Sequence, residues 1–471
     1  VTASTRLVGY EGENILLSYL GRVMYDYAGK YYLTASLRSD GVNLFAPSNR
    51  RGYFPSASIM WKVSEDFFKD VREIDLLKFR VGWGSTGNSN IGSDFQYYDK
   101  ITEASNFSPV FGTSQTIANA QYIFYGMASG DIHWESADMI NVGTDINLFK
   151  NKLQLTFEYY YKSVSDLLLQ IPISYSFGRQ DGNPWFNLGN IHNTGIEISG
   201  QWRDQIGKLG YGINASFTTT KNNVDYMPIS DVTTTYNRTK VGYPIGSLFG
   251  YRAERIIQSN ENYNSYPKQN NAIPQPGDLK YTDMNNDGVI NELDKTIIGK
   301  TIPSLNLTLG LDLNYKNFDF NVFMYGLGDY QIYNYQRASM SSMNYQDMDH
   351  NKLLDYALNH WSTTNPSTKY VRVDPSNKNL NDQISSWWIE DGSFLRIKDI
   401  QLGYNFDQNV TKKLSLNSLR LYVSATNMFT LTKYKGRDPE GFASSDPLNS
   451  GVDQGAYSNA RSFNFGIQLG L

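Results

Sequence analysis

Residues 462–471 read Ser-Phe-Asn-Phe-Gly-Ile-Gln-Leu-Gly-Leu, so every second residue from Phe463 to Leu471 is apolar and the residues between them are polar or glycine. Side chains of a β-strand point alternately to its two faces, so this segment has one apolar and one polar face. Residues 306–315 repeat the pattern, with apolar residues at every second position from Leu307 to Tyr315. Both segments have about the length that a tilted strand needs to cross the hydrocarbon of a bilayer. The pattern therefore predicts an all-β fold, a transmembrane antiparallel β-barrel.

Alternation of this kind predicts thirteen strands along the chain. They are residues 15–27, 31–40, 52–63, 76–84, 138–149, 152–165, 194–203, 210–220, 305–315, 318–326, 393–405, 419–430 and 462–471. The segment 393–405 breaks its own pattern, because Arg396 and Lys398 fall on the face that Ile400 continues. We expect a β-bulge or a membrane boundary near Asp399.

The connections between these strands alternate in length. The long ones lie near 85–137, 166–193, 221–304, 327–392 and 431–461, and shorter ones separate them. Outer-membrane barrels have short periplasmic turns and long extracellular loops. The parity therefore places all five long loops on the outer side and ends the last strand at the periplasm. A soluble β-sandwich gives no reason for such a sorting.

Two segments of the predicted outer loops have regular patterns of their own. Residues 246–257 look like a strand, and the parity of the connections keeps them inside an outer loop. Residues Asp347–Trp361 place Leu354, Leu358 and Trp361 at helical spacing. We expect a helix there, packed on the barrel mouth.

Composition limits the class of protein. The 471 residues are 40% hydrophobic, with a mean hydropathy of −0.46 and no apolar run long enough for a membrane-spanning helix. A net charge of −4 gives no reason to expect nucleic acid as a partner. The absence of cysteine excludes disulfides and thiolate metal sites. Aromatic residues are abundant, and Tyr25, Tyr27, Tyr31 and Tyr32 gather around one short turn, where we expect a periplasmic aromatic belt.

Several stretches resemble the SusC-like (RagA/SusC) family of TonB-dependent outer-membrane transporters. They are YYLTASLRSDG at 31–41, RGYFPSAS at 51–58, KFRVGWGSTGN at 78–88, GDLKYTDMNNDGVI at 277–290, EDGSFLRIKD at 390–399, LYVSATNMFTLTKY at 421–434 and DPE at 438–440. Together they extend over nearly the whole chain in the order of the family. One departure is the final residue, Leu471, where the family usually ends in an aromatic residue.

The resemblance implies a barrel of about 22 strands with a plugged lumen, of which this chain is the C-terminal part of about 13 strands. It implies localisation in the outer membrane of a Gram-negative cell, surrounded by lipid. It further implies import of bulky nutrients, glycans or peptides, together with a SusD-like surface lipoprotein. TonB–ExbB–ExbD would act through the N-terminal part. We expect the plug and the N-terminal segments, including the signal peptide and early strands, to lie outside this chain.

One loop segment fits the pattern of a calcium-binding loop. Oxygen ligands stand at loop positions 1, 3, 5, 7, 9 and 12, with a glycine for the sharp turn between them. The ligands are Asp283, Asn285, Asp287, Val289 through its carbonyl, Asn291 and Asp294. Asp294 replaces the usual Glu, and its shorter side chain weakens bidentate binding. The loop either binds a structural Ca²⁺ or forms a turn held by side-chain to backbone hydrogen bonds.

Two aromatic pairs in the long loops are candidates for substrate contact. The rings of Trp185 and Phe186, and those of Trp387 and Trp388, could stack on sugars or grip a peptide, or could pack within the loops or against a lid protein. The sequence offers no catalytic motif, so we expect no enzyme. Import is the predicted function. The alternatives are a SusC-like barrel that acts as a scaffold subunit without transport, and a secreted adhesin or hydrolase, which requires a polar exterior.

Overall fold

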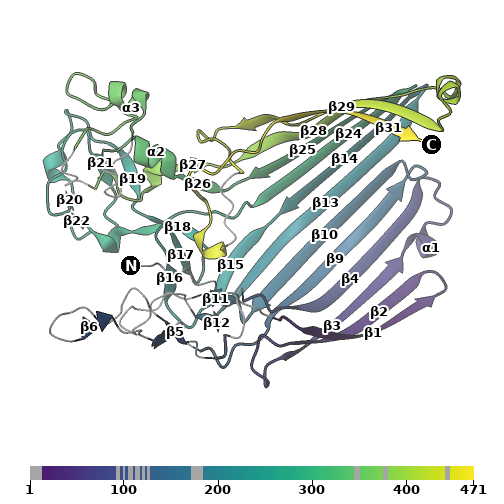
Figure 1. The fold of residues 1–471 in the computed structure, drawn as a ribbon, viewed down its shortest axis with the longest axis horizontal. Coiled ribbons are helices and arrows are strands. Elements are labelled where there is room, and N and C mark those ends of the chain that lie inside the picture. Colours follow the sequence, from purple (N-terminus) through teal and green to yellow (C-terminus); the bar gives the residue numbers. More distant parts are fainter. Residues whose placement is uncertain are drawn as a thin grey trace.

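The computed structural model describes residues 13–91, 96–98, 128–170, 184–343, 351–374, 380–440 and 446–471, with the backbone of four short strands between residues 101 and 124. Thirteen long strands of these residues form one curved antiparallel sheet (Figure 1). They are β1 (Leu16–Tyr27), β2 (Tyr31–Val42), β3 (Arg51–Lys62), β4 (Ile74–Asn88), β9 (Glu135–Leu148), β10 (Leu153–Ser165), β13 (Asn190–Ile206), β14 (Leu209–Thr219), β24 (Leu305–Tyr315), β25 (Phe318–Gly328), β28 (Phe394–Asn405), β29 (Ser418–Thr432) and β31 (Ser462–Gly470).

These strands neighbour one another in chain order, as a meander, and each corresponds to one predicted segment. A further strand, β15 (Lys221–Tyr226), pairs with the start of β13 beyond the point where β14 ends. The short turns lie at one end of the sheet and the long connections at the other (Figure 1). The predicted all-β class, the antiparallel sheet and the sorting of the loops are therefore confirmed.

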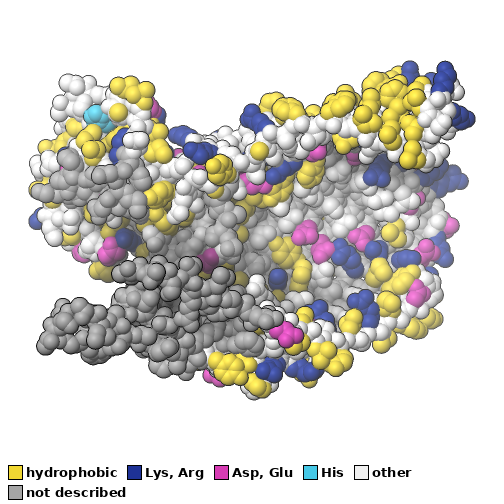
Figure 2. Space-filling view, viewed as in Figure 1, with side chains coloured by type: hydrophobic (Ala, Val, Ile, Leu, Met, Phe, Trp, Pro, Cys, Tyr) yellow, Lys and Arg dark blue, Asp and Glu magenta, His cyan; other side chains and the backbone are white. Residues whose placement is uncertain are grey.

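The sheet exposes its apolar face. On β4, Phe79, Val81 and Trp83 have 44–50% of their surface exposed, whereas the charged side chains of Lys78 and Arg80 on the other face are 23% and 30% exposed. A soluble protein buries such rows of apolar residues, so this exposure indicates that the convex face contacts lipid. Figure 2 shows the hollowed face, where acidic and basic side chains gather.

Strand register joins these apolar residues into a continuous band. Phe320 of β25 lies opposite Leu402 of β28, which lies opposite Val423 of β29 and then Phe465 of β31. Each of these pairs is fixed by the antiparallel ladder, because a shift of one residue would turn the whole apolar set toward the lumen. The band therefore depends on register as much as on composition.

The predicted irregularity near Asp399 is a β-bulge at Lys398. The register of β28 against both neighbours skips one residue between Ile397 and Asp399. Residues with odd numbers face outward before the bulge, and residues with even numbers face outward after it. Ile397 and Ile400 can therefore both face lipid, while Arg396 turns inward and becomes 3% exposed. The bulge resolves the conflict that the sequence pattern contains.

The short-turn end of the sheet carries the expected aromatic residues. Tyr31 stacks on Trp61 at 6.2 Å between ring centroids, and Trp61 contacts Phe67 of the short helix α1 (Ser64–Phe67) edge-on. Asp66 of the same helix forms an ion pair with Lys30 and accepts a hydrogen bond from the indole of Trp61. These partners, Lys30 first, lower the pKa of Asp66 to about 2. The turn is thus fixed by both rings and charges.

The long loops form an assembly of short strands at the opposite end (Figure 1). Its strands are β11 (Leu168–Gln170), β12 (Trp185–Asn187), β16 (Asp231–Thr233), β17 (Asn237–Lys240), β18 (Ser247–Gly250), β19 (Ala253–Ile256), β20 (Lys268–Gln269), β21 (Leu279–Tyr281), β22 (Val289–Ile290), β23 (Thr296–Gly299), β26 (Gln331–Asn334), β27 (Ile389–Asp391) and β30 (Val452–Asp453). The strand-like residues 246–257 lie inside this assembly, as predicted. The remaining short strands are β5 (Ile101–Glu103), β6 (Val110–Phe111), β7 (Ile117–Ala118) and β8 (Tyr122–Phe124).

The predicted helix Asp347–Trp361 is wrong in extent and in packing. Residues 347–350 lie outside the described residues, and the helix observed is α3 (Leu354–Asn359). Leu354 and Leu358 are 73% and 68% exposed, and Tyr356 is the residue of α3 that is buried. Tyr356 and Trp361 pack into an apolar cluster of the loop assembly, so α3 packs on the loops and not on the barrel mouth.

The other α-helices of the described residues are α2 (Tyr335–Met340) in the loops and α4 (Gln408–Thr411) at a short turn. Short 3-10 helices lie at Tyr263–Ser265, Glu292–Asp294, Ser386–Trp388, Lys412–Leu414 and Pro447–Asn449. Within the described part of the chain, no helix combines the length and the apolar character needed to cross a membrane.

The substitution Val423→Arg tests the lipid-facing band. Val423 lies midway along β29 on the convex face, so a guanidinium there would lie in the hydrocarbon of the bilayer. It should lower the free energy of unfolding by about 2–4 kcal/mol. Ser424→Arg places the same charge on the polar face and is the matched control. Denaturant unfolding of the intact protein in lipid vesicles measures both variants. Equal costs for the two substitutions would contradict the assignment of faces.

Candidate functional site

The inner wall of the sheet carries a network of paired charges. The Lys78 ammonium lies 2.5 Å from the Asp145 carboxylate, and Arg80 bridges Asp145 and Glu158. The side chain of Asn141 donates a hydrogen bond to Glu158 at 2.9 Å. These residues come from β4, β9 and β10, whose register places them on one face. The same alternation that exposes apolar residues outside therefore gathers ion pairs inside.

A second ion pair lies nearer the C-terminus of the chain. Arg420 of β29 donates to both oxygens of the Asp319 carboxylate on β25, at 3.1 and 2.5 Å, across the intervening strand β28. Gly403 of β28 makes this pair possible, because a Cβ atom there would lie 2.5 Å from Asp319 and 2.6 Å from Arg420. The inner wall is thus a polar surface suited to water or to a polar partner, and the outer wall is not.

Arg396 fixes a long loop to the sheet. Its guanidinium contacts Asp438 at 2.5 Å and Glu440 at 2.7 Å, and Lys398 contacts Glu440 at 2.8 Å. Arg396 and Asp438 are almost fully buried, so this pair is shielded from water. Arg396 and Asp438 are 42 residues apart in the sequence, and their contact joins the segments 390–399 and 438–440 into one structural unit. That unit anchors the loop 431–461 at the rim.

A buried carboxylate joins two other loops. Asp278 is fully buried, and its Oδ1 accepts hydrogen bonds from Arg372 at 2.6 Å and from Asn381 at 2.8 Å. Burial raises the pKa of Asp278, and Arg372 opposes that shift by stabilising the charged form. Gly277, at a φ of +93°, leaves room for Trp361 and Arg372, which a Cβ atom would meet at 2.5–2.7 Å. The loops 221–304 and 327–392 are therefore one packed body.

The segment Asp283–Asp294 closes on itself through its own side chains. The Asp283 carboxylate accepts hydrogen bonds from the backbone N–H groups of Asn286 at 2.7 Å and Gly288 at 2.8 Å. Asp294 is fully buried and accepts from the N–H groups of Met284 and Asn291, both at 2.8 Å.

Three other side chains of this segment also accept hydrogen bonds from its backbone N–H groups. Asn285 accepts from the N–H of Asp287, Asp287 from that of Val289, and Asn291 from that of Leu293. Val289 begins the short strand β22. In the described part of the chain, no three His, Asp or Glu side chains gather closely enough to hold a metal. The calcium site stays a prediction.

The aromatic candidates lie in packed surroundings. Trp388 is 1% exposed inside an apolar cluster of the loop assembly, and Trp387 packs against that cluster and its neighbour. Trp185 and Phe186 are half-buried in β12, where Trp185 packs on a cluster near the rim. The structure does not bring the two pairs into one site. Contact with substrate stays a prediction for all four residues.

Sequence reasoning missed the two arginines that organise the loops. Arg396 was singled out only as an exception to alternation, and Arg372 gave no signal. The exception was informative, because a cation on an apolar face needs a buried acidic partner or a change of face. Here the bulge supplies the change of face and Asp438 supplies the partner.

The apolar convex wall, the polar concave wall and the one-sided long loops define an outer-membrane β-barrel protein. The chain matches the family model described as "TonB dependent receptor-like, beta-barrel" over residues 17–428. The chain belongs to this family, and the predicted outer-membrane localisation is confirmed with it.

Two curated relatives carry related names. The chain is 30% identical over 478 aligned positions to the TonB-dependent receptor P3 of Formosa agariphila, covering 98% of this chain and 46% of the relative. It is 28% identical over 470 positions to the TonB-dependent receptor SusC of Bacteroides thetaiotaomicron, covering 98% and 44%. The resemblance to the SusC-like family is confirmed. The chain spans about half the length of the curated relatives it matches.

A solved structure shares the fold. A chain of the RagAB peptide transporter superposes with a TM-score of 0.80 at 21% identity, covering 97% of this chain and 47% of that one. At this level of identity the likeness concerns the fold alone.

The substitution Arg396→Met tests the loop anchor. It leaves Asp438 buried without its cation, which should cost about 3–5 kcal/mol of folding free energy. Arg437→Gln, at an exposed neighbouring position, should stay within about 0.5 kcal/mol of the parent. Denaturant unfolding in micelles compares them. If Arg396→Met costs no more than the control, the buried pair does not hold the loop.

Proposed function

We propose that this chain forms part of the wall and the outer loops of an importer of bulky nutrients, glycans or peptides. The single observation that carries the proposal is the division of the sheet into a lipid-facing wall and an inner wall of paired charges, beneath one packed loop body. Paired charges such as Arg80 with Glu158 give a polar lining without a strong net field. Such a lining suits a passage for hydrated solutes.

The edges of the sheet support a larger barrel. Among the described strands, β1 and β31 each pair with one neighbour only. Unpaired N–H and C=O groups cost several kcal/mol each in hydrocarbon. We therefore propose that further strands close the sheet. On the ground of the family match, we also propose that a plug occupies the lumen and that TonB–ExbB–ExbD acts on that plug.

The loop body supports a partner on the outer side. The loops are held together by buried contacts such as Arg372 with Asp278 and Arg396 with Asp438, so they present a preformed surface. The structural neighbour is named as the RagAB peptide transporter, and one relative is named SusC. We propose a SusD-like surface lipoprotein as the partner, covering this loop body.

Co-purification tests the proposal. The intact protein, tagged and extracted from outer membrane in detergent, should bring down a SusD-like lipoprotein in near-equal amount. Arg396→Met, which loosens the loop anchor, should reduce the captured lipoprotein, and Lys208→Gln, at an exposed short turn on the opposite end of the sheet, should not. Recovery of a large multi-subunit assembly without such a lipoprotein would favour the scaffold function instead.

We also propose that Asp283–Asp294 binds a structural Ca²⁺. The support is the pre-folded turn: Gly288 has a φ of +82° and Asn286 one of +60°, which curl the loop around Asp283. Each carboxylate oxygen that accepts one amide retains a second lone pair for an ion. Asp283, Asn285, Asp287, the Val289 carbonyl, Asn291 and Asp294 would be the ligands.

If the loop binds Ca²⁺ and unfolds together with the barrel, the Tm of the intact protein should be about 2–4 °C higher in calcium than in EGTA. The double substitution Asp283→Asn with Asp287→Asn should abolish that increase. Glu292→Gln changes a loop residue that is not a proposed ligand and should preserve it. The same Tm in calcium and in EGTA would show that the turn works without an ion.

A further inference from the structure

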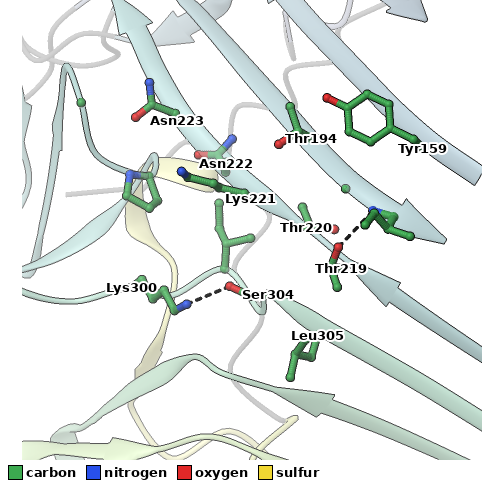
Figure 3. Close-up of a pocket in the computed structure, with 15 residues that line it drawn as sticks. Tyr159, Thr194, Thr219, Thr220, Lys221, Asn222, Asn223, Lys300, Ser304 and Leu305 are labelled. Carbon is green, nitrogen blue, oxygen red and sulfur yellow. Dashed lines mark hydrogen bonds between the residues drawn. The ribbon is translucent and has the colours of Figure 1, made fainter. Parts of the chain in front are cut away.

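A cavity of about 590 Å³ opens on the outer wall where the sheet meets the loops (Figure 3). At this point β14 ends at Thr219, and β15 replaces it as the partner of β13. The change of partner leaves a notch between the start of β15 and the start of β24. The cavity is therefore built by strand topology and not by loop packing alone.

The lower part of the cavity belongs to the lipid-facing band. Its walls include Tyr159, Ile196 and Leu305, which are 51%, 48% and 38% exposed on the convex face. Register continues this surface into the band, since Tyr159 lies opposite Ile196 and Leu305 opposite Thr219. An acyl chain in the membrane would therefore run directly into the floor of the cavity.

The part of the cavity toward the loops carries two cations and several polar groups beside the apolar Pro244 and Ile302. Lys221 and Lys300 both line it, with Asn223, Thr194 and Ser304. Figure 3 shows the hydrogen bond from the Lys300 ammonium to the Ser304 hydroxyl, at 2.8 Å. Among the described residues that line the cavity, none is acidic.

The two lysines differ in whether they have an ion-pair partner. Lys300 also forms an ion pair with Asp329, whereas Lys221 is exposed and makes no ion pair with any described residue. Lys221 is thus the charge that an incoming anion would meet.

The lumen side of the notch is closed. The Tyr160 hydroxyl donates to the Thr219 carbonyl at 3.2 Å and lies 2.9 Å from the Thr220 hydroxyl. Gly195 packs so closely that a Cβ atom would lie 1.8 Å from the Thr219 oxygen. A ligand of this cavity therefore enters from the membrane side and does not share the route through the barrel.

Exposed tyrosines indicate the level in the membrane at which the cavity lies. Tyr226 and Tyr243, 58% and 42% exposed, lie in the connection that borders the cavity at Gly242 and Pro244. Tyrosine prefers the boundary between hydrocarbon and headgroups. The long-loop end of the sheet is the outer side, so the cavity lies at the headgroup level of the outer leaflet.

We propose that this cavity binds the phosphorylated headgroup of an outer-leaflet glycolipid, with an acyl chain along Tyr159, Ile196 and Leu305. Lys221 contacts the phosphate, Lys300 and Asn223 contact the sugar or a second phosphate, and the apolar floor takes the chain. This inference does not depend on import, since a scaffold barrel would present the same wall.

Native mass spectrometry of the intact protein in detergent tests the proposal with lipid A as the probe. Loss of one charge-assisted contact in Lys221→Gln should reduce retained lipid A about tenfold. Lys208→Gln removes an exposed lysine at a short turn, at the other end of the sheet, and should retain the parent amount. An unchanged Tm for both variants checks that each is folded.

Dephosphorylated lipid A separates headgroup recognition from general association with lipid. The proposal expects it to be retained about tenfold less by the parent protein and equally by parent and Lys221→Gln. Equal retention of the two lipids by the parent, or no effect of Lys221→Gln on lipid A, would overturn the proposal. Retention of inorganic phosphate without lipid would also overturn it, because the cavity would then be an ion site.

Discussion

The structure depends on the two-residue period of the β-strand in a protein that has lipid on one side and water on the other. Each strand must present apolar residues outward and polar residues inward, and it must do so in register with its neighbours. The row Phe320, Leu402, Val423 and Phe465 meets that constraint across four strands. The ion pairs of Arg80 and Arg420 follow from it on the opposite face.

The constraint explains why so much of the wall could be predicted from sequence. In β24 the apolar residues Leu307, Leu309 and Leu311 alternate with the polar residues Asn306 and Thr308. The strand can therefore face lipid with only one of its two sides. All thirteen segments with such alternation became strands of the sheet, and their order in the sheet is their order in the chain. Even the exception at Arg396 and Lys398 was informative, because an alternation that fails in the middle of a strand indicates a bulge or a membrane boundary, and the structure shows the bulge.

The loops could not be predicted in the same way, because their cohesion comes from contacts without a period. Arg372 and Asp278 are 94 residues apart, and Arg396 and Asp438 are 42 apart. The pattern that predicted a helix over Asp347–Trp361 weighed Leu354 and Leu358, which the structure exposes, and overlooked Tyr356, which it buries. Tertiary packing against Tyr251 and Leu279 decides that segment, and helical spacing does not.

The wall, the anchored loops and the notch at Thr219 have one common requirement, that the convex face lies in lipid. This chain contains no cysteine, so single cysteines along β24 can carry a spin label at known positions. In the intact protein reconstituted in vesicles, labels at Leu307, Leu309 and Leu311 should be most accessible to oxygen, and those at Asn306 and Thr308 to a water-soluble nickel complex. Accessibility that does not alternate along the strand, or that alternates in the opposite phase, would contradict the account.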